Sequence, residues 1–189
     1  GIYKYSLNKL TKIYPLDADR DQSPFGSAQG EELLHAERRR GTEDGKVEAE
    51  EYLSNEHIFA MATDVAGRLL AGISGKRCRL CRLEGEKTET IFEPNDAKYI
   101  FAMVLDEGGN IYLGTGPEGK IYKLDSLGRK PQMIYDSRDK NILSLAIAPA
   151  SNKQGYIYAG SDTRGLVYKI HSRTPQDGQA HNKATVLYD

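Results

Sequence analysis

The sequence predicts an all-β repeat protein built from short antiparallel strands, and three observations carry that prediction. A segment at residues 58–73 recurs at residues 100–115, with matching residues 42 positions apart, and a third copy begins 42 positions later at Ile142. Each copy consists of short apolar runs rich in Ile, Tyr, Leu and Val. Gly, Pro, Asp and Ser separate the runs too closely for helices. A fixed period of this size indicates an array of like units, each burying its apolar faces against its neighbours.

The clearest copy contains four predicted strands, at residues 99–105, 110–114, 120–124 and 132–135. Both alternating faces of the first strand are apolar, as expected of a sheet that is covered on both sides. The third strand carries a Lys or Arg that recurs at one position in the copies, which is typical of a partly solvated outer strand. The glycines between the first and second strands are predicted to supply the positive φ of a tight hairpin.

This pattern divides the chain into five segments. Residues 1–19 are a half unit that holds the third and fourth strands, and residues 52–97, 98–140 and 141–189 are complete units. The sequence therefore predicts fourteen strands in all. Residues 20–51 interrupt the repeat.

The interrupting segment, residues 20–51, is strongly charged. Between residues 31 and 51, eight acidic and four basic residues occur among twenty-one. Such a composition does not bury enough apolar surface to offset its ordering entropy, so a solvated insertion is predicted. A short helix over residues 31–40 is an alternative, and Arg38, Arg39 and Arg40 could form a phosphate-binding cluster.

Four strands in each unit of this length resemble the blades of a β-propeller of the broad WD-repeat (WD40-like), YVTN and NHL type. The resemblance is sharpest at GTGPEGKIYKLD, residues 114–125. The chain has no Trp and so lacks the Trp-Asp dipeptide of the WD group. The resemblance implies about three and a half blades, and hence a fragment of a larger ring, because propellers close with four to eight blades.

Composition narrows the choice of partners. The chain holds 26 basic and 27 acidic residues, so no global field favours nucleic acid or acidic lipid. No apolar segment is long enough to span a membrane. The expected partners are a protein or a small ligand of unknown identity, together with the missing blades, and the compartment stays open.

Three motifs invite a chemical interpretation, and each has a simpler structural one. Cys78 and Cys81 form a lone CxxC, for which packing is the prediction and a redox pair or a metal site the alternative. The Gly-rich loop at residues 114–120 precedes a strand, whereas a phosphate loop requires a helix. Asp64 and Asp106 open turns, with a catalytic or calcium-binding role as the alternative. No catalytic residue, cofactor or metal is predicted.

The propeller resemblance also implies a binding surface, because loops between the second and third strands and between blades share one face. The residues carried onto that face are Lys76, Arg77, Asn95, Asp96, Pro117, Glu118, Asp139, Lys140, Asp162 and Arg164. The expected function is that of a non-enzymatic binding module or scaffold. The alternative is a metal-dependent hydrolase or lyase of the gluconolactonase-like group, with ligands among Asn95, Asp96, Asp139 and Asn141.

Overall fold

All regular structure in the described residues is β, and these residues contain no helix. The computed structural model describes residues 2–6, 9–14, 56–151, 154–173 and 183–188. The chain divides into two units, residues 1–54 and residues 55–189. Within the described ranges, no helix is long and apolar enough to cross a membrane.

The first unit contains one antiparallel hairpin, in which β1 (Ile2–Ser6) pairs with β2 (Lys9–Tyr14). Tyr3 lies opposite Lys12 in the register. These are the two strands that the sequence predicts for residues 1–19. The predicted insertion at residues 20–51, with its alternative helix and arginine cluster, lies outside the described residues.

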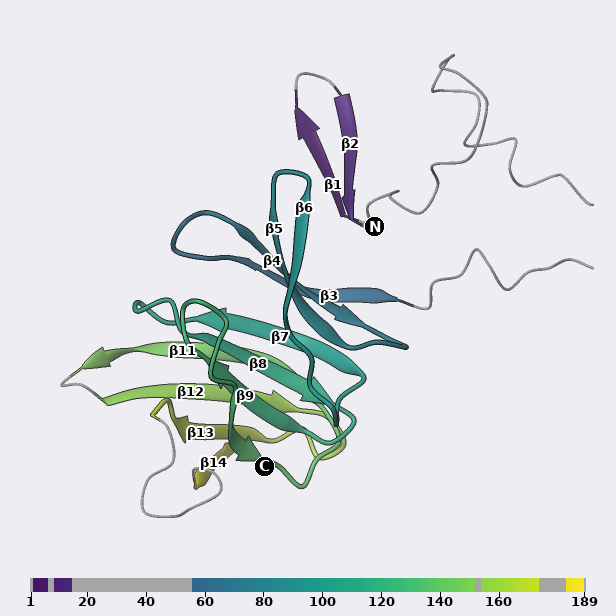
Figure 1. The fold of residues 1–189 in the computed structure, drawn as a ribbon. Coiled ribbons are helices and arrows are strands. Elements are labelled where there is room, and N and C mark those ends of the chain that lie inside the picture. Colours follow the sequence, from purple (N-terminus) through teal and green to yellow (C-terminus); the bar gives the residue numbers. More distant parts are fainter. Residues whose placement is uncertain (1, 7–8, 15–55, 152–153, 174–182, 189) are drawn as a thin grey trace, which may run out of the picture. The chain divides into compact units, whose positions relative to one another are not determined.

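The second unit contains three antiparallel sheets of four strands, each arranged in chain order (Figure 1). The first sheet comprises β3 (His57–Thr63), β4 (Leu69–Ser74), β5 (Arg79–Glu84) and β6 (Lys87–Phe92). The second sheet comprises β7 (Tyr99–Leu105), β8 (Ile111–Gly116), β9 (Lys120–Leu124) and β10 (Gln132–Asp136). The third sheet comprises β11 (Ile142–Ser151), β12 (Gln154–Ser161), β13 (Val167–His171) and β14 (Ala184–Tyr188). None of the three closes on itself.

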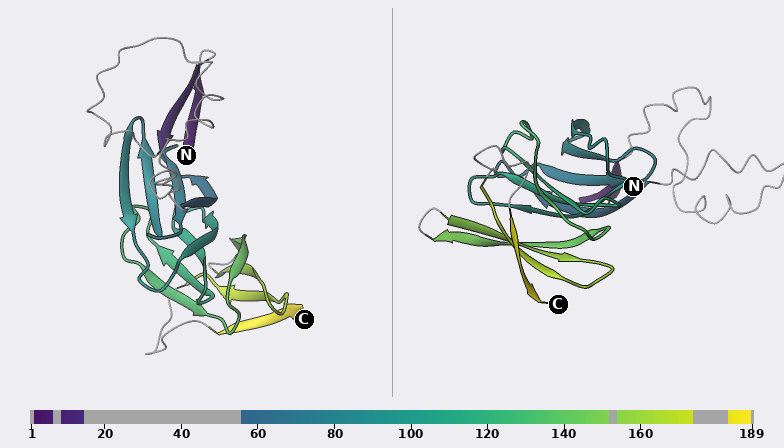
Figure 2. Two further views of the ribbon diagram at one scale, coloured as in Figure 1. Left: turned by 90° about the vertical axis from the view of Figure 1, so that its right-hand side faces the viewer. Right: turned by 90° about the horizontal axis from the view of Figure 1, so that it is seen from below.

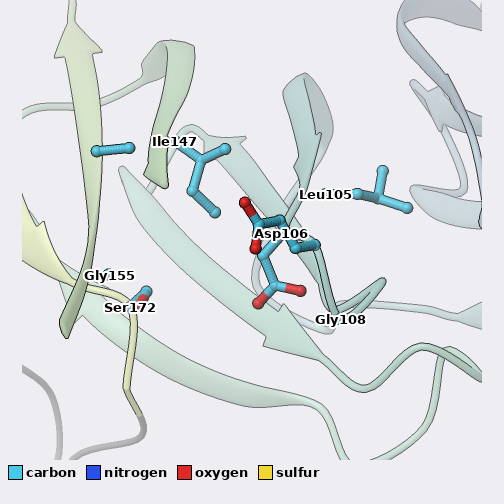
Figure 3. A pocket seen from close by; sticks show the side chains of 8 residues that line it. Leu105, Asp106, Gly108, Ile147, Gly155 and Ser172 are labelled. Carbon is cyan, nitrogen blue, oxygen red and sulfur yellow. The ribbon is translucent and has the colours of Figure 1, made fainter. Parts of the chain in front are cut away.

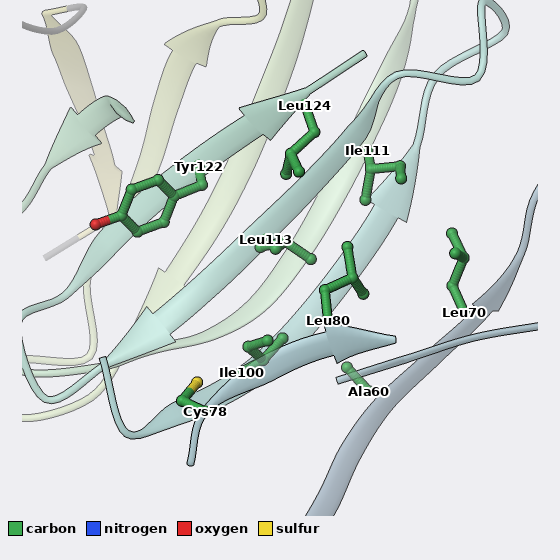
Figure 4. Close-up of a cluster of buried hydrophobic side chains, with 9 residues drawn as sticks. All are labelled: Ala60, Leu70, Cys78, Leu80, Ile100, Ile111, Leu113, Tyr122 and Leu124. Atoms are coloured by element: carbon green, nitrogen blue, oxygen red, sulfur yellow. The ribbon is translucent and has the colours of Figure 1, made fainter. Parts of the chain in front are cut away.

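Two apolar clusters join successive sheets. Between the first and second sheets, Leu70 and Leu80 pack against residues such as Ile111 and Leu113, all fully buried (Figure 4). Between the second and third sheets, Tyr112 and similar side chains pack against residues of β11, β12 and β13. β7 contacts both β3 and β11, so the first strands of neighbouring sheets lie side by side (Figure 2).

A glycine on the second strand of one sheet receives an isoleucine from the first strand of the next. A Cβ built on Gly72 would lie 2.7 Å from Cγ2 of Ile100, and one built on Gly114 would lie 2.7 Å from Cγ2 of Ile142. Real Cβ atoms do not approach a neighbour so closely, so both positions need glycine. The repeat of 42 residues between Gly72 and Gly114 thus reflects one packing contact used twice.

The strands of each sheet run between two ends of the second unit. We call one end the loop end: it holds the β4–β5, β8–β9 and β12–β13 turns and the β6–β7 and β10–β11 links. The opposite end, which we call the turn end, holds the remaining hairpin turns. There Gly67 and Gly109 have φ of 76° and 77°, which confirms the predicted positive φ in the first hairpin of the first and second sheets.

Candidate functional site

The loop end carries all ten residues predicted for the binding face. Lys76 and Arg77 lie in the β4–β5 turn, and Asn95 and Asp96 in the β6–β7 link. The other six lie in the β8–β9 turn, the β10–β11 link and the β12–β13 turn; they are Pro117, Glu118, Asp139, Lys140, Asp162 and Arg164.

Backbone hydrogen bonds tie these loops to one another. Gly75 N donates to Lys98 O at 2.8 Å, which joins the β4–β5 turn to the β6–β7 link. Lys98 N donates in turn to Gly116 O at 2.8 Å, and Ser137 N donates to Gly119 O at 3.1 Å. The loops of the first two sheets and the link to the third therefore form one connected rim.

Asp139 is the most enclosed acidic side chain of this rim, with a residue exposure of only 3%. Its Oδ1 accepts from Arg164 Nε at 2.7 Å, and its Oδ2 accepts from Ser161 Oγ at 2.5 Å and Tyr168 OH at 2.8 Å. Burial opposes ionisation, but the donors Arg164, Ser161 and Tyr168 outweigh it and hold the pKa of Asp139 below its usual value. Burial and this carboxylate raise the pKa of Tyr168 to about 12.

Asp96, in the link that leads into the second sheet, makes a related set of contacts. It accepts from Lys120 Nζ at 2.5 Å and from Tyr122 OH. Burial raises the pKa of Asp96, but the bonds from Lys120 and Tyr122 more than compensate and lower it. In the second and third sheets, an Asp of the link that leads into the sheet thus accepts a hydrogen bond from a tyrosine on the third strand.

Two more predicted site residues are engaged within the rim. Asp162 accepts from the backbone N–H of Asn141 at 3.0 Å and from its side-chain amide. Burial opposes ionisation of Asp162, and the bonds from Asn141 nonetheless lower its pKa. Arg77 donates from Nε to Glu93 at 3.1 Å and makes a second bond to the same carboxylate. These pairs brace the loops.

The remaining predicted residues present exposed side chains. In the described part of the chain, the side chains of Lys76, Asn95, Glu118 and Lys140 are exposed and make no hydrogen bond or salt bridge. Pro117 is exposed beside them. Sequence reasoning missed Lys98 and Arg138, which are also exposed at this end. Their place in the β6–β7 and β10–β11 links is the sequence signal that could have identified them.

The turn-opening interpretation of Asp64 and Asp106 agrees with the contacts that both residues make. Asp64 Oδ1 accepts from the backbone N–H groups of Ala66 and Arg68, both at 2.9 Å. Asp106 Oδ1 accepts from Asn110 N at 2.8 Å. These are local bonds that fix a turn, and they occupy the carboxylate oxygens.

A pocket of about 290 Å³ lies at the turn end, between the second and third sheets (Figure 3). Leu105 and Ile147 give it apolar walls, and Asp106 and Glu107 supply its two carboxylates. Asp106 Oδ2 is already bound by Asn110 Nδ2 and Tyr112 OH, at 2.8 and 2.9 Å. This pocket is separated from the predicted binding face by the length of the strands.

The two cysteines are packed side chains. Both are buried, and burial raises the pKa of Cys78 to about 11, so its thiol is protonated near neutral pH. Cys78 belongs to the cluster between the first two sheets, and Cys81 Sγ lies 3.7 Å from Thr90 Oγ1. In the described ranges, no three His, Cys, Asp or Glu side chains are placed to hold a metal ion together.

No protein-family model matches this chain, and no curated protein matches it either. The arrangement of the rim therefore carries the functional argument.

Proposed function

We propose that this chain is a non-enzymatic binding module of the β-propeller type that recognises its ligand through the loop end. The observation that supports this is a division of labour among the side chains of the rim. The carboxylates of Asp96, Asp139 and Asp162 accept hydrogen bonds from other groups of the protein. Lys76, Glu118 and Lys140 are exposed beside them.

This division suits recognition by a preformed surface. The internal bonds fix the course of each loop before a ligand arrives, so less conformational entropy is lost on binding. Exposed polar side chains of both signs can then make directional contacts around Pro117. Rigid scaffolds that display loops in this way commonly serve as binding surfaces.

The metal-dependent hydrolase or lyase has weaker support. That function requires carboxylates free to coordinate a cation, and hard cations take several oxygen ligands. Both oxygens of Asp139 are bound by the protein's own donors. Coordination would have to displace Arg164 and Tyr168 from a carboxylate that they already satisfy.

A peptide-library selection on the 189-residue chain tests the proposed function. We expect that Lys76→Ala, Glu118→Ala or Lys140→Ala lowers the affinity for the selected peptides by about ten-fold or more wherever the replaced side chain contacts the peptide. The reason is that the binding energy of an interface is concentrated in few side chains. Titration calorimetry measures the affinity of each variant. Since all three side chains are exposed, the melting temperature should stay unchanged.

The matched controls are Lys87→Ala and Glu107→Ala, which change exposed side chains at the turn end. Selected peptides that respond to these controls and ignore the rim variants would contradict the proposal. A rise in melting temperature with millimolar calcium would favour the hydrolase or lyase instead.

A further inference from the structure

Among the described residues, the third sheet has one face covered by the second sheet and one face on which no other sheet packs, which we call the uncovered face. Ile157, Tyr168 and Ile170 pack against the second sheet and are buried. On the opposite face, Tyr158 and Val167 are half-buried, and Leu187 on β14 is 53% exposed. An exposed apolar sheet face of this kind indicates an interaction surface.

This uncovered face repeats the face through which the second sheet binds the third. Tyr158 and Val167 stand at the positions of Tyr112 and Ile121, which are completely buried between those sheets. The cross-strand registers match, because each pair lies 46 residues apart and occupies the second and third strands. The same surface therefore occurs once covered and once open.

The outer strand continues the correspondence. Leu187 lies between Val186 and Tyr188 at a register shift, as Ile134 does between its own neighbours on β10. Ile134 is fully buried against the third sheet, whereas Leu187 is exposed. Ile91 holds this place on β6 and packs against the apolar cluster between the first and second sheets. In both covered interfaces, a large apolar residue at this place therefore contacts the next sheet.

The glycine of the contact is present as well. Gly160 stands where Gly72 and Gly114 receive the isoleucines of the following sheets. A Cβ built on Gly160 would meet only Ser144 of its own sheet. Among the described residues, the place beside Gly160 holds no isoleucine.

The covered and the uncovered face also share a lysine on the third strand. Lys123 Nζ crosses from the second sheet to donate to Ser172 O of the third at 2.9 Å, and Tyr112 OH donates to the same oxygen at 3.3 Å. Lys169 occupies the matching position, and its Nζ lies 4.0 Å from the centre of the Tyr156 ring. In the covered interface this cation reaches a backbone carbonyl that follows the third strand of the next sheet.

We propose that the uncovered face of the third sheet binds one further four-stranded unit of the same repeat. That unit places a first-strand isoleucine against Gly160 and a backbone carbonyl within reach of Lys169. The occupant is assigned by continuity with an interface seen in the molecule, since repeat proteins reuse nearest-neighbour contacts along their length. This inference is independent of what the loop end binds.

The test appends a second copy of residues 93–136, an existing link and sheet, after Asp189 of the full chain. Leu187→Cys serves as the reporter, because the native cysteines are buried. We expect the appended unit to slow alkylation of this cysteine by about ten-fold or more, as covered positions react only through opening. Gly160→Val in the extended chain should restore fast alkylation, since its side chain fills the place of the isoleucine.

The matched control is Val186→Cys, whose side chain lies on the opposite face of β14 and is 47% exposed. Its alkylation should be unaffected by the appended unit. Fast alkylation of Leu187→Cys in the extended chain, or protection that survives Gly160→Val, overturns the proposal. Concentration-dependent protection in the unextended chain would assign the face to a second copy instead and would also overturn it.

Discussion

Asp139 shows how a carboxylate at the loop end is used by the fold itself. It is almost inaccessible to solvent, and a guanidinium and two hydroxyls donate to it. Charge-assisted bonds of this kind are stronger than neutral ones, which offsets the cost of burying the charge. The residue therefore anchors the β10–β11 link on the third strand of the following sheet.

Replacing this carboxylate tests its structural role. Asp139→Asn should lower the free energy of unfolding at pH 7 by about 1–3 kcal/mol, because the charge that faces Arg164 is lost and one accepting oxygen is replaced by an amide group that donates. Its pKa is held below the ordinary 3.8, so the carboxylate stabilises the fold above that pH. This contribution is lost as the pH falls through the lower folded value. Urea unfolding at pH 7 and pH 3 measures both effects.

The variant should lose less stability than the natural chain between those two pH values. Some acid sensitivity will remain, because Asp64, Asp96 and Asp162 also have lowered pKa values. Parallel losses in the two proteins would show that Asp139 does not contribute in this way.

Residue-scale prediction from the sequence succeeded where the determining contacts are local. Asp64 and Asp106 bond to backbone groups within four residues, so the turn pattern alone identifies their role. Asp139 bonds to side chains more than twenty residues away, and its burial depends on how β10 leads into β11. The sequence placed it correctly on the loop end but did not reveal that it is buried.

At the scale of strands and sheets, the glycine–isoleucine contact sets how closely two neighbours approach. Gly114 faces Cγ2 of Ile142, and the backbone oxygen of that isoleucine lies 3.1 Å from the Cβ position. A side chain at residue 114 would push β11 away from β8. The interface is consequently sensitive to a single methyl group.

A double-mutant cycle measures this contact. Gly114→Ala should destabilise the chain by about 1–3 kcal/mol through overpacking. Ile142→Ala should cost about 2–5 kcal/mol through lost burial. The double variant should cost less than the two changes added together, with a coupling of about 0.5–3 kcal/mol, because the smaller side chain leaves room for the new methyl. Additive costs in chemical unfolding would mean that the two residues do not touch.

Strand positions were well predicted because turn residues mark their limits. The predicted strands at residues 99–105 and 120–124 coincide with β7 and β9, and the other two of that unit differ by one or two residues. The sequence did not indicate that β11 would extend to Ser151, since Pro149 interrupts the apolar run. Pairing of Ser151 with Gln154 across a register shift accommodates that proline.

At the scale of the whole second unit, the three sheets follow one another through equivalent contacts. β7 touches β3 on one side and β11 on the other, and each apolar cluster joins consecutive sheets. The turns between second and third strands and the links between sheets consequently fall at one end, as a shared binding surface would require. The repeat of the four-stranded sheet thus underlies both the packing of the sheets and the position of the rim.

The sequence predicted this arrangement in outline, but two features depend on three-dimensional placement. The turn-end pocket arises where Leu105 and Ile147 from different sheets meet, and no motif marks it. The uncovered face becomes recognisable only when Tyr158 and Tyr112 are compared for burial. Repetition in sequence shows that positions are equivalent, whereas the structure shows which of them are covered.

The most direct test of the packing between successive sheets is a nuclear Overhauser experiment on the chain with labelled isoleucine methyl groups. We expect contacts from the γ2 methyl of Ile100 to the α-protons of Gly72, and from the γ2 methyl of Ile142 to the α-protons of Gly114. Absence of both contacts, with each methyl close to protons of its own sheet alone, would contradict the packing of successive units.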